Sequence, residues 1–549
     1  MKKLILSIVL VAMCFTLFAC TPNSTTAPTE EDSLGRCLLE GYLENIPQEY
    51  YSISTSDQKT NLTPEAPVTP EMLSVMLANL SQDLGFNLNG YLKNQASFSD
   101  AETDTWYTEA VHWVYIFEMI GRDTLEIGTP MTKETLGKFL YQYLYQFYDY
   151  RDVPYNLEAS FADAAELTSS KKEFAALEYL NLLVLDDENK YYPTKEATIQ
   201  EACSMFQKLA DFCKENITMK HLMKRGVSTD FRILQYCNPA KPSNQENLYN
   251  NADFYKELWE KGFDHIRVPV AFDAENPWTG QWPDHAYFDE NGNLTPTEEY
   301  IEIIDTIIDY ALDANLFVIL DVHGYEGKVY GEEATGERLE TSMKNYISIW
   351  TYLADRYQDK SNKLIYELYN EPVMDADSLE EFMYKGVEIV RNIDEDRTVF
   401  VTYESASYHA MSGEHPEMIE EFKKDPNIWF TCHNYFPYEF TIENNRTHVD
   451  HYGQPVYYPF NEDMDFSLTN SIMAIAEDEL KNGIDYWVGE WGAYDNVALE
   501  DRVAYCKRSA ELYRKLGIAW CKWEISWGFA MYDPYEDVWN EEILAALFS

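Results

Sequence analysis

Two glutamates in the 549-residue chain stand in short motifs suited to acid–base chemistry. Glu371 follows Asn370 at the end of the apolar run LIYELYNEPV, and Glu490 lies in the strand-like segment YWVGEWG. Hydrolysis of a glycosidic bond uses two carboxyls, one that protonates the leaving oxygen and one that stays ionised and attacks the anomeric carbon. The motifs therefore predict that both glutamates are delivered to one pocket, with Pro372 ending the strand where a loop begins.

Further polar and aromatic residues stand at the ends of other predicted strands. They are Arg267 in IRVPV, His323 in DVHGY, His433 and Tyr435 in CHNYFP, and Trp523 in CKWEI. An amide such as Asn370 is suited to binding a sugar 2-hydroxyl, and Trp523 to stacking under a sugar ring. Arg267, His433 and Tyr435 are suited to orienting and stabilising a nucleophilic carboxylate.

Each of these residues has an ordinary structural explanation when it is taken alone. A histidine such as His323 or His433 is commonly a hydrogen-bonded core residue, and Arg267 would pair with a buried acid such as Asp321. A fold without a site would not need so many polar strand ends, so their joint occurrence favours a shared functional site.

Eight apolar segments in the second part of the chain alternate with amphipathic helical segments. The predicted strands are RGVSTDF (from Arg225), FDHIRVPV (Phe263), FVILDVH (Phe317), LIYELYNE (Leu364), TVFVTYES (Thr398), IWFTCHNY (Ile428), YWVGEWG (Tyr486) and AWCKWEIS (Ala519). This alternation predicts an α/β fold, a (β/α)8 TIM barrel over residues 219–549, whose strand ends converge on one face. A doubly wound open sheet is the alternative, but no glycine-rich phosphate loop follows any of these segments.

These motifs, in this order along the chain, resemble glycoside hydrolase family 5, the cellulase-containing family of retaining β-glycosidases. The resemblance rests on GFDHIRVPV, FVILDVHG, LIYELYNEP, CHNYFPYEFT, GEWGA and CKWEISWGFAMYD. It implies that Glu371 is the general acid/base and Glu490 the nucleophile. It also implies that the remaining active-site positions are Arg267, His323, Asn370, His433, Tyr435 and Trp523.

The chain departs from the family pattern at the wall of the expected cleft. Gly324 stands where many members have a second histidine, RGVSTDF replaces a common Gly-Asn pair, and Glu524 follows Trp523 where Asp-Asn-Gly is frequent. These departures affect the choice of sugar rather than the chemistry. Loop aromatics that could bind further sugar units, or simply pack, are Trp278, Trp282, Tyr325, Tyr438 and Trp527.

Residues 63–216 contain repeated helical segments with an all-α character. VTPEMLSVMLANL, MTKETLGKFLYQYL and TIQEACSMFQKLADF each open with a polar turn and a glutamate, Glu71, Glu134 or Glu201. Segments beginning Phe-x-Asp precede the second and third of them, and the first repeat is incomplete. The pattern resembles S-layer-homology (SLH) modules, which anchor exported proteins to cell-wall polysaccharide; because the binding turn keeps only Lys133 as a basic residue, a helical spacer is the alternative.

The first residues predict export. MKKLILSIVLVAMCFTLFAC has two lysines and a short apolar run, so residues 1–19 are expected to be a signal peptide. The ending before Cys20 resembles a bacterial lipobox, which implies lipidation of Cys20 and a membrane-anchored, cell-surface lipoprotein; ordinary secretion is the alternative. Residues 20–62, rich in Thr, Ser, Pro and acid, are expected to be a flexible linker.

The chain carries a formal charge of −52, with 94 acidic and 42 basic residues. Such a charge repels phosphate backbones, which argues against a nucleic-acid partner. The nine cysteines show neither a disulfide framework nor a metal knuckle, and the predicted chemistry requires no metal or cofactor.

Together these observations predict an exported retaining endo-β-1,4-glycanase with β-glucan as substrate. The alternatives are an inverting enzyme, a β-mannanase or xyloglucanase of the same fold, a non-catalytic glycan-binding surface lipoprotein, and a barrel metallohydrolase that uses His323 and His433.

Overall fold

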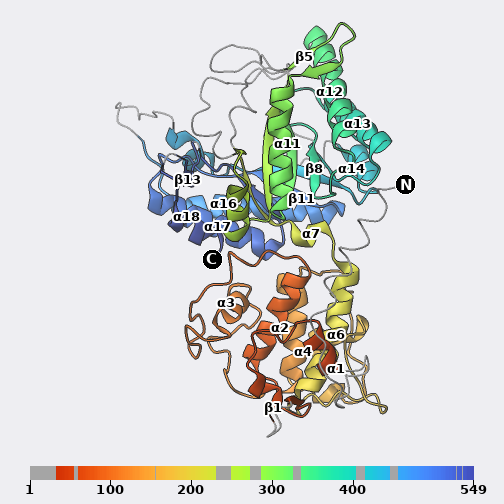
Figure 1. Ribbon diagram of the computed structural model, residues 1–549, viewed down its shortest axis with the longest axis vertical. Helices are drawn as coiled ribbons and strands as arrows, with labels where there is room; N and C mark the ends of the chain where they lie inside the picture. The colour runs from red at the N-terminus through yellow and green to blue at the C-terminus, as the bar shows by residue number, and fades with distance from the viewer. Residues whose placement is uncertain are drawn as a thin grey trace, which may run out of the picture.

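The fold combines a closed barrel with a helical domain below it (Figure 1). The computed structural model describes residues 33–54, 60–154, 156–229, 249–272, 286–324, 335–402, 415–445, 456–526, 528–534 and 536–549. Cys20 and the predicted signal peptide lie outside the described residues. None of the helices in these ranges has the length and apolar character needed to cross a bilayer.

The barrel contains the eight predicted strands, all parallel and paired in chain order. They are β3 (Arg225–Ser228), β4 (His265–Ala271), β7 (Phe317–Gly324), β8 (Leu364–Glu367), β9 (Val399–Val401), β10 (Ile428–His433), β11 (Tyr486–Glu490) and β12 (Ala519–Lys522). The barrel closes where β12 pairs with β3, with Trp520 opposite Arg225. The predicted (β/α)8 fold is confirmed, because the alternative open sheet would leave two edges unpaired.

Helices cover the outside of the barrel between consecutive strands (Figure 1). They are α10 (Ala252–Glu260), α11 (Glu298–Asp313), α12 (Gly336–Tyr357), α13 (Ala376–Ile393), α14 (Pro416–Phe422), α16 (Glu462–Asn482), α17 (Leu499–Leu516) and α18 (Glu541–Leu547). Short elements complete this half: α7 (Met219–Leu222), α15 (Tyr438–Thr441), η4 (Glu443–Asn445) and the two-stranded pairs β5 (Ala286–Phe288) with β6 (Leu294–Pro296) and β13 (Tyr532–Asp533) with β14 (Val538–Trp539). Side-chain caps fix several starts; Thr297, for example, accepts the backbone N–H of Tyr300.

The barrel interior changes from apolar to charged along the strands. On β7, Phe317 and Ile319 belong to a compact apolar cluster, and Asp321 follows two residues later. On β8, Ile365 belongs to the same cluster and Glu367 follows in the same alternation. Because successive side chains of a strand point to opposite faces, these acids lie inside the barrel toward its carboxyl end.

Three long helices of the helical domain start from one ring of backbone hydrogen bonds. They are α2 (Pro70–Asp83), α4 (Lys133–Gln142) and α6 (Ile199–Asn216). The Met131 N–H donates to the Val68 carbonyl, the Val68 N–H to the Ala197 carbonyl, and the Ala197 N–H to the Met131 carbonyl. This closed ring gives the three repeats an approximate three-fold arrangement.

The three shorter helices fill the gaps between the long ones. They are α1 (Ser33–Leu39), α3 (Thr108–Ile116) and α5 (Lys171–Tyr179), which pack on α6, α2 and α4 respectively. Helix α1 buries Leu34 and Cys37 against the core, so the expected linker over 20–62 is wrong for this segment. The first repeat is therefore complete, with its first helix paired to the last one. The remaining elements here are η1 (Gln48–Tyr50), β1 (Ser52–Ser54), β2 (Thr60–Leu62), η2 (Tyr143–Phe147) and η3 (Ala164–Glu166).

The repeated glutamates serve the helical domain itself. Glu134 accepts backbone N–H groups of residues 168–170 at the start of α5, and Glu71 accepts the N–H of Gly128. The third repeat differs, because the backbone ring aligns Gln200, not Glu201, with the other two positions. Glu201 instead closes a capping box with Thr198, and Gln200 accepts the N–H of Leu34.

The helical domain docks on the amino-terminal end of the barrel. The Asn87 side chain donates to the carbonyls of Trp259 and Phe263, 2.8 Å each, while Arg225 donates to the Asn87 carbonyl at 2.8 Å. Gly90 is buried here, and a Cβ on it would lie 2.3 Å from the Phe548 ring. The two parts therefore share one tightly packed interface.

We expect Gly90→Ala to destabilise the protein by about 1–3 kcal/mol, because the added methyl overpacks this interface. Gly121→Ala is the matched control, since a Cβ there meets nothing within 4 Å. Urea unfolding of both variants would check this. Equal midpoints for the two variants would contradict the close docking.

Candidate active site

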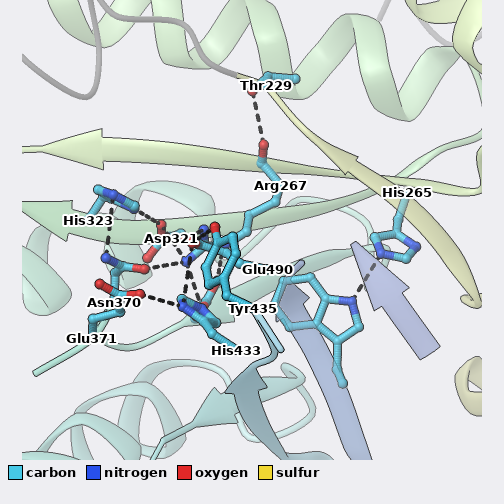
Figure 2. Close-up of polar contacts among 12 residues, drawn as sticks. Thr229, His265, Arg267, Asp321, His323, Asn370, Glu371, His433, Tyr435 and Glu490 are labelled. Carbon is cyan, nitrogen blue, oxygen red and sulfur yellow. Dashed lines mark hydrogen bonds and ion pairs between the residues drawn. The ribbon is translucent and has the colours of Figure 1, made fainter. Parts of the chain in front are cut away.

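Seven of the eight residues predicted for the barrel site stand at or just beyond the carboxyl ends of strands, and the long side chain of Arg267 reaches them from the third residue of β4. Arg267 is on β4, His323 on β7, His433 on β10 and Glu490 at the end of β11. Asn370 and Glu371 follow β8, Tyr435 follows β10 and Trp523 follows β12. Figure 2 shows the polar members of the set converging on one another from these separate strands. The lipidation site Cys20 lies outside the described residues.

Glu490 is held as a carboxylate from two sides. Arg267 Nη1 donates to its Oε1 at 2.5 Å, and the Tyr435 hydroxyl donates to its Oε2 at 2.7 Å. Burial alone would raise the pKa of Glu490, but the charges of His433 and Arg267 outweigh it and hold this pKa below its usual range. The same burial raises the pKa of Tyr435 well above its usual value, so its hydroxyl stays a donor.

Glu371 faces Glu490 across His433. Its Oε1 lies 2.8 Å from His433 Nδ1, and that nitrogen is 3.5 Å from Glu490 Oε2. One oxygen of each glutamate and a ring nitrogen of His433 all lie within 4.8 Å of one another. Burial lowers the pKa of His433, but the neighbouring Glu490 and Glu371 raise it overall. Glu371 itself has a φ of +43°, a left-handed backbone conformation that is uncommon outside glycine and is typical of functional sites.

Arg267 is the hub of the charged network. It is fully buried and forms a two-pronged pair with Glu367, Nε–Oε2 2.6 Å and Nη2–Oε1 3.0 Å. Its Nη2 also lies 2.9 Å from Asp321 Oδ2 and donates to Asn370 Oδ1 at 2.8 Å. The structural role expected for Arg267, as partner of Asp321, and its role at Glu490 therefore occur together.

Glu367 was missed by the sequence analysis, and Asp321 was considered only as a structural partner. Both are fully buried. A usable signal was present, because Glu367 is the only charged residue in the apolar strand LIYE, on the same face as Ile365. A lone acid on the inner face of a buried strand requires a partner inside the barrel.

Trp523 and His323 form a second wall of the site. Their rings stack with centroids 5.6 Å apart and planes 9° apart. His323 Nδ1 lies 2.8 Å from Asp321 Oδ2, and its Nε2 is 3.4 Å from the Asn370 amide nitrogen. Behind the tryptophan, the buried Lys522 donates to the carbonyls of Trp523 and Phe529. Burial lowers the pKa of Lys522 to about 8.

The structure also locates several residues of the expected cleft wall. Gly324 ends β7, Glu524 is buried, and Tyr438 is 37% exposed at the start of α15. The other loop aromatics named above, Trp278, Trp282, Tyr325 and Trp527, lie outside the described residues.

One group in the described part of the chain has the spacing to hold a metal ion: Glu371, His433 and Glu490. The metallohydrolase alternative requires His323 and His433 together. His323 is not part of this group and is hydrogen-bonded to Asp321 instead.

We expect Arg267→Met to cost about 3–5 kcal/mol of stability near neutral pH, because it leaves buried carboxylates without their cation. The loss should shrink toward pH 5, since protonation of these carboxyls removes the uncompensated charge. Arg356→Met is the control; Arg356 pairs with Asp305 at the surface, where such pairs contribute at most about 1 kcal/mol. Urea unfolding at pH 5 and pH 8 measures both; a pH-independent loss at Arg267 would contradict the charge network.

Comparison with known proteins places this chain in a family. The family model described as cellulase (glycosyl hydrolase family 5) matches residues 225–528. The cellulase/esterase CelE of Acetivibrio thermocellus is 24% identical over 299 residues, covering 51% of this chain and 33% of that protein. Endoglucanase A of Ruminococcus albus is 24% identical over 302 residues, covering 52% of this chain and 76% of that protein. The chain thus spans only a third of the first relative and about three quarters of the second.

Among solved structures, endoglucanase Cel5A from the hyperthermophilic Thermotoga maritima is 24% identical. The match covers 59% of this chain and 97% of that one, with a TM-score of 0.48. The family model itself runs from the first residue of β3 to just beyond β12 and takes in more than half of the 549 residues. This chain therefore belongs to the cellulase family, glycosyl hydrolase family 5.

Proposed function

We propose that the protein is a retaining endo-β-1,4-glycanase that hydrolyses β-glucan by double displacement. Glu490 is the nucleophile and Glu371 the general acid/base in this proposal. Membership of the cellulase family and the endoglucanase names of its relatives support the reaction class.

The observation that carries the proposal is the spacing of the two carboxyls. An oxygen of Glu371 and an oxygen of Glu490 lie within 4.8 Å of each other. Retaining glycosidases place their carboxyl groups about 5–5.5 Å apart, whereas inverting enzymes need about 6.5–9.5 Å to admit a water molecule. The short spacing therefore favours retention over the inverting alternative.

The surroundings of the two glutamates favour different roles. Glu490 accepts hydrogen bonds from Arg267 and Tyr435, which stabilise its ionised, nucleophilic form. Glu371 faces His433 rather than the arginine. Two carboxyls that differ in this way are suited to acid and nucleophile roles in one reaction.

In the first step, an oxygen of Glu490 forms a bond to the anomeric carbon while the bond to the leaving glycosidic oxygen breaks. The Glu371 proton passes to that oxygen, so the leaving chain departs as a neutral alcohol. In the second step, Glu371 removes a proton from water, whose oxygen attacks the anomeric carbon and releases Glu490. The glutamates return to their starting protonation states.

Neighbouring residues supply orientation. Asn370 is held by Arg267 and lies beside Glu371, where its amide is suited to the sugar 2-hydroxyl. Trp523 stacks on His323 and offers a flat apolar surface for a sugar ring.

We expect the protein after residue 20 to release reducing sugar from soluble β-glucan. Glu371→Ala and Glu490→Ala should each lower kcat by several orders of magnitude, because each removes a group that forms or breaks bonds. Release from mannan or xyloglucan alone would favour the mannanase or xyloglucanase alternative. Binding to a polymer without release from any would favour the glycan-binding alternative. Activity that EDTA abolishes and a divalent cation restores would favour the metallohydrolase alternative.

We expect Tyr435→Phe to move the acid limb of kcat/KM to higher pH by about one unit. The lost donor stabilises ionised Glu490, so its removal raises the pKa of the nucleophile; a hydrogen bond to a charged group is worth about 1.5–3 kcal/mol. Tyr486→Phe is the control, because Tyr486 donates to the buried Asp478 at 2.7 Å on the outside of the barrel. An unchanged acid limb in Tyr435→Phe would argue against Glu490 as the nucleophile.

The location and the helical domain enter this proposal as predictions from the sequence. Export, with lipidation at Cys20, would place the enzyme at the cell surface. The SLH-like repeats would either bind cell-wall polymer or act as a spacer. The internal bonds of Glu71 and Glu134 are compatible with the spacer alternative.

A further inference from the structure

Glu367 is placed where it controls the orientation of Arg267. It is fully buried, and its carboxylate meets the guanidinium through two parallel contacts, at Nε and Nη2. A guanidinium is planar, so two bonds along one edge fix the plane of the whole group. The nitrogen left over, Nη1, then points at Glu490 Oε1.

The charges around Arg267 do not balance. One guanidinium faces three carboxyls, those of Asp321, Glu367 and Glu490. Excess buried negative charge is costly, so one of these carboxyls gains a proton more readily than usual. Burial raises the pKa of Glu367 to about 7, although Arg267 opposes this.

Each element packed against Glu367 presents a defined group. Arg267 comes from β4, Asp321 from β7, His433 from β10 and Cys521 from β12. From β9 the neighbour is the apolar Phe400. Arg267 thus donates to both oxygens of Glu367, and no sugar can reach a side chain with no exposed surface.

We propose that Glu367 is a positioning residue of the reaction, which holds Arg267 in the orientation that presents Nη1 to the nucleophile. This inference rests on the proposed function of Glu490. Asp321 has a separate task, because its Oδ2 is shared between Arg267 and His323. An apolar residue in place of Glu367 would fill the barrel without the cost of a buried charge, so an acid here is explained by what it does to Arg267.

The test compares Glu367→Gln with Glu479→Gln. Glutamine has the shape of glutamate but turns an N–H₂ group toward an Arg267 N–H, so one of the two contacts is lost. Glu479 is a matched control: it accepts the Tyr486 N–H at 2.8 Å, outside the site, and burial raises its pKa to about 7 as well.

We expect Glu367→Gln to lower kcat on β-glucan about ten- to hundredfold with KM changed less than about threefold, because the loss falls on the reaction step. The alkaline limb of the pH profile of kcat for this variant should also move to lower pH. In the wild type, Glu367 ionises as pH rises through about 7, and this negative charge helps the general acid keep its proton. Glu479→Gln should match the wild type in both respects, and a purely structural role for Glu367 would not move the limb.

A folded Glu367→Gln variant with wild-type kcat and alkaline limb would overturn the proposal. If that variant does not fold, Glu367→Asp is the alternative test. It keeps the charge but is one methylene too short, so it should have a lower kcat and the same alkaline limb in its pH profile as the wild type. A fully active Glu367→Asp would overturn the proposal. If the wild-type protein shows no turnover on any polymer, the proposed function is overturned, and the role of Glu367 with it. If the wild type is active, a negative result for the Glu367 variants overturns only the role of Glu367.

Discussion

The burial of Arg267 is the interaction on which the rest of the site depends. A guanidinium without exposed surface requires acids around it, and it draws them from three different strands, β7, β8 and β11. Only a closed barrel brings those strands within reach of one side chain. The arginine thus couples the geometry of the fold to the ionisation of Glu490.

The interior of the barrel is largely apolar at one end of its axis and charged at the other. Toward the amino-terminal end its interior holds apolar side chains such as Ile319 and Ile365, with Trp487 donating to the buried His265. Toward the carboxyl end the same strands carry charged groups that face one another. The helical domain docks at the amino-terminal end of the barrel, opposite the carboxyl face where the charged residues converge (Figure 1).

The helical domain shows how repeats with weak sequence similarity form one body. The backbone ring through Val68, Met131 and Ala197 uses no side chains, so it tolerates the divergence of the three repeats. The equivalent positions Glu134 and Gln200 differ in residue type, but each accepts backbone N–H groups at the start of the helix packed beside it. Helix α1 closes the circle by packing on α6, far away in the chain.

The sequence by itself determined the eight strands and the two glutamates, because buried parallel strands read as apolar runs and polar residues at their ends stand out. Tertiary structure decided the rest. The pairing of Glu367 with Arg267 is visible only in the folded barrel. The sequence of one strand does not show which residues of the neighbouring strands lie opposite its inward-facing side chains. Helix α1 was read as linker for the same reason: the surface that buries Leu34 and Cys37 comes from α6, about 170 residues later.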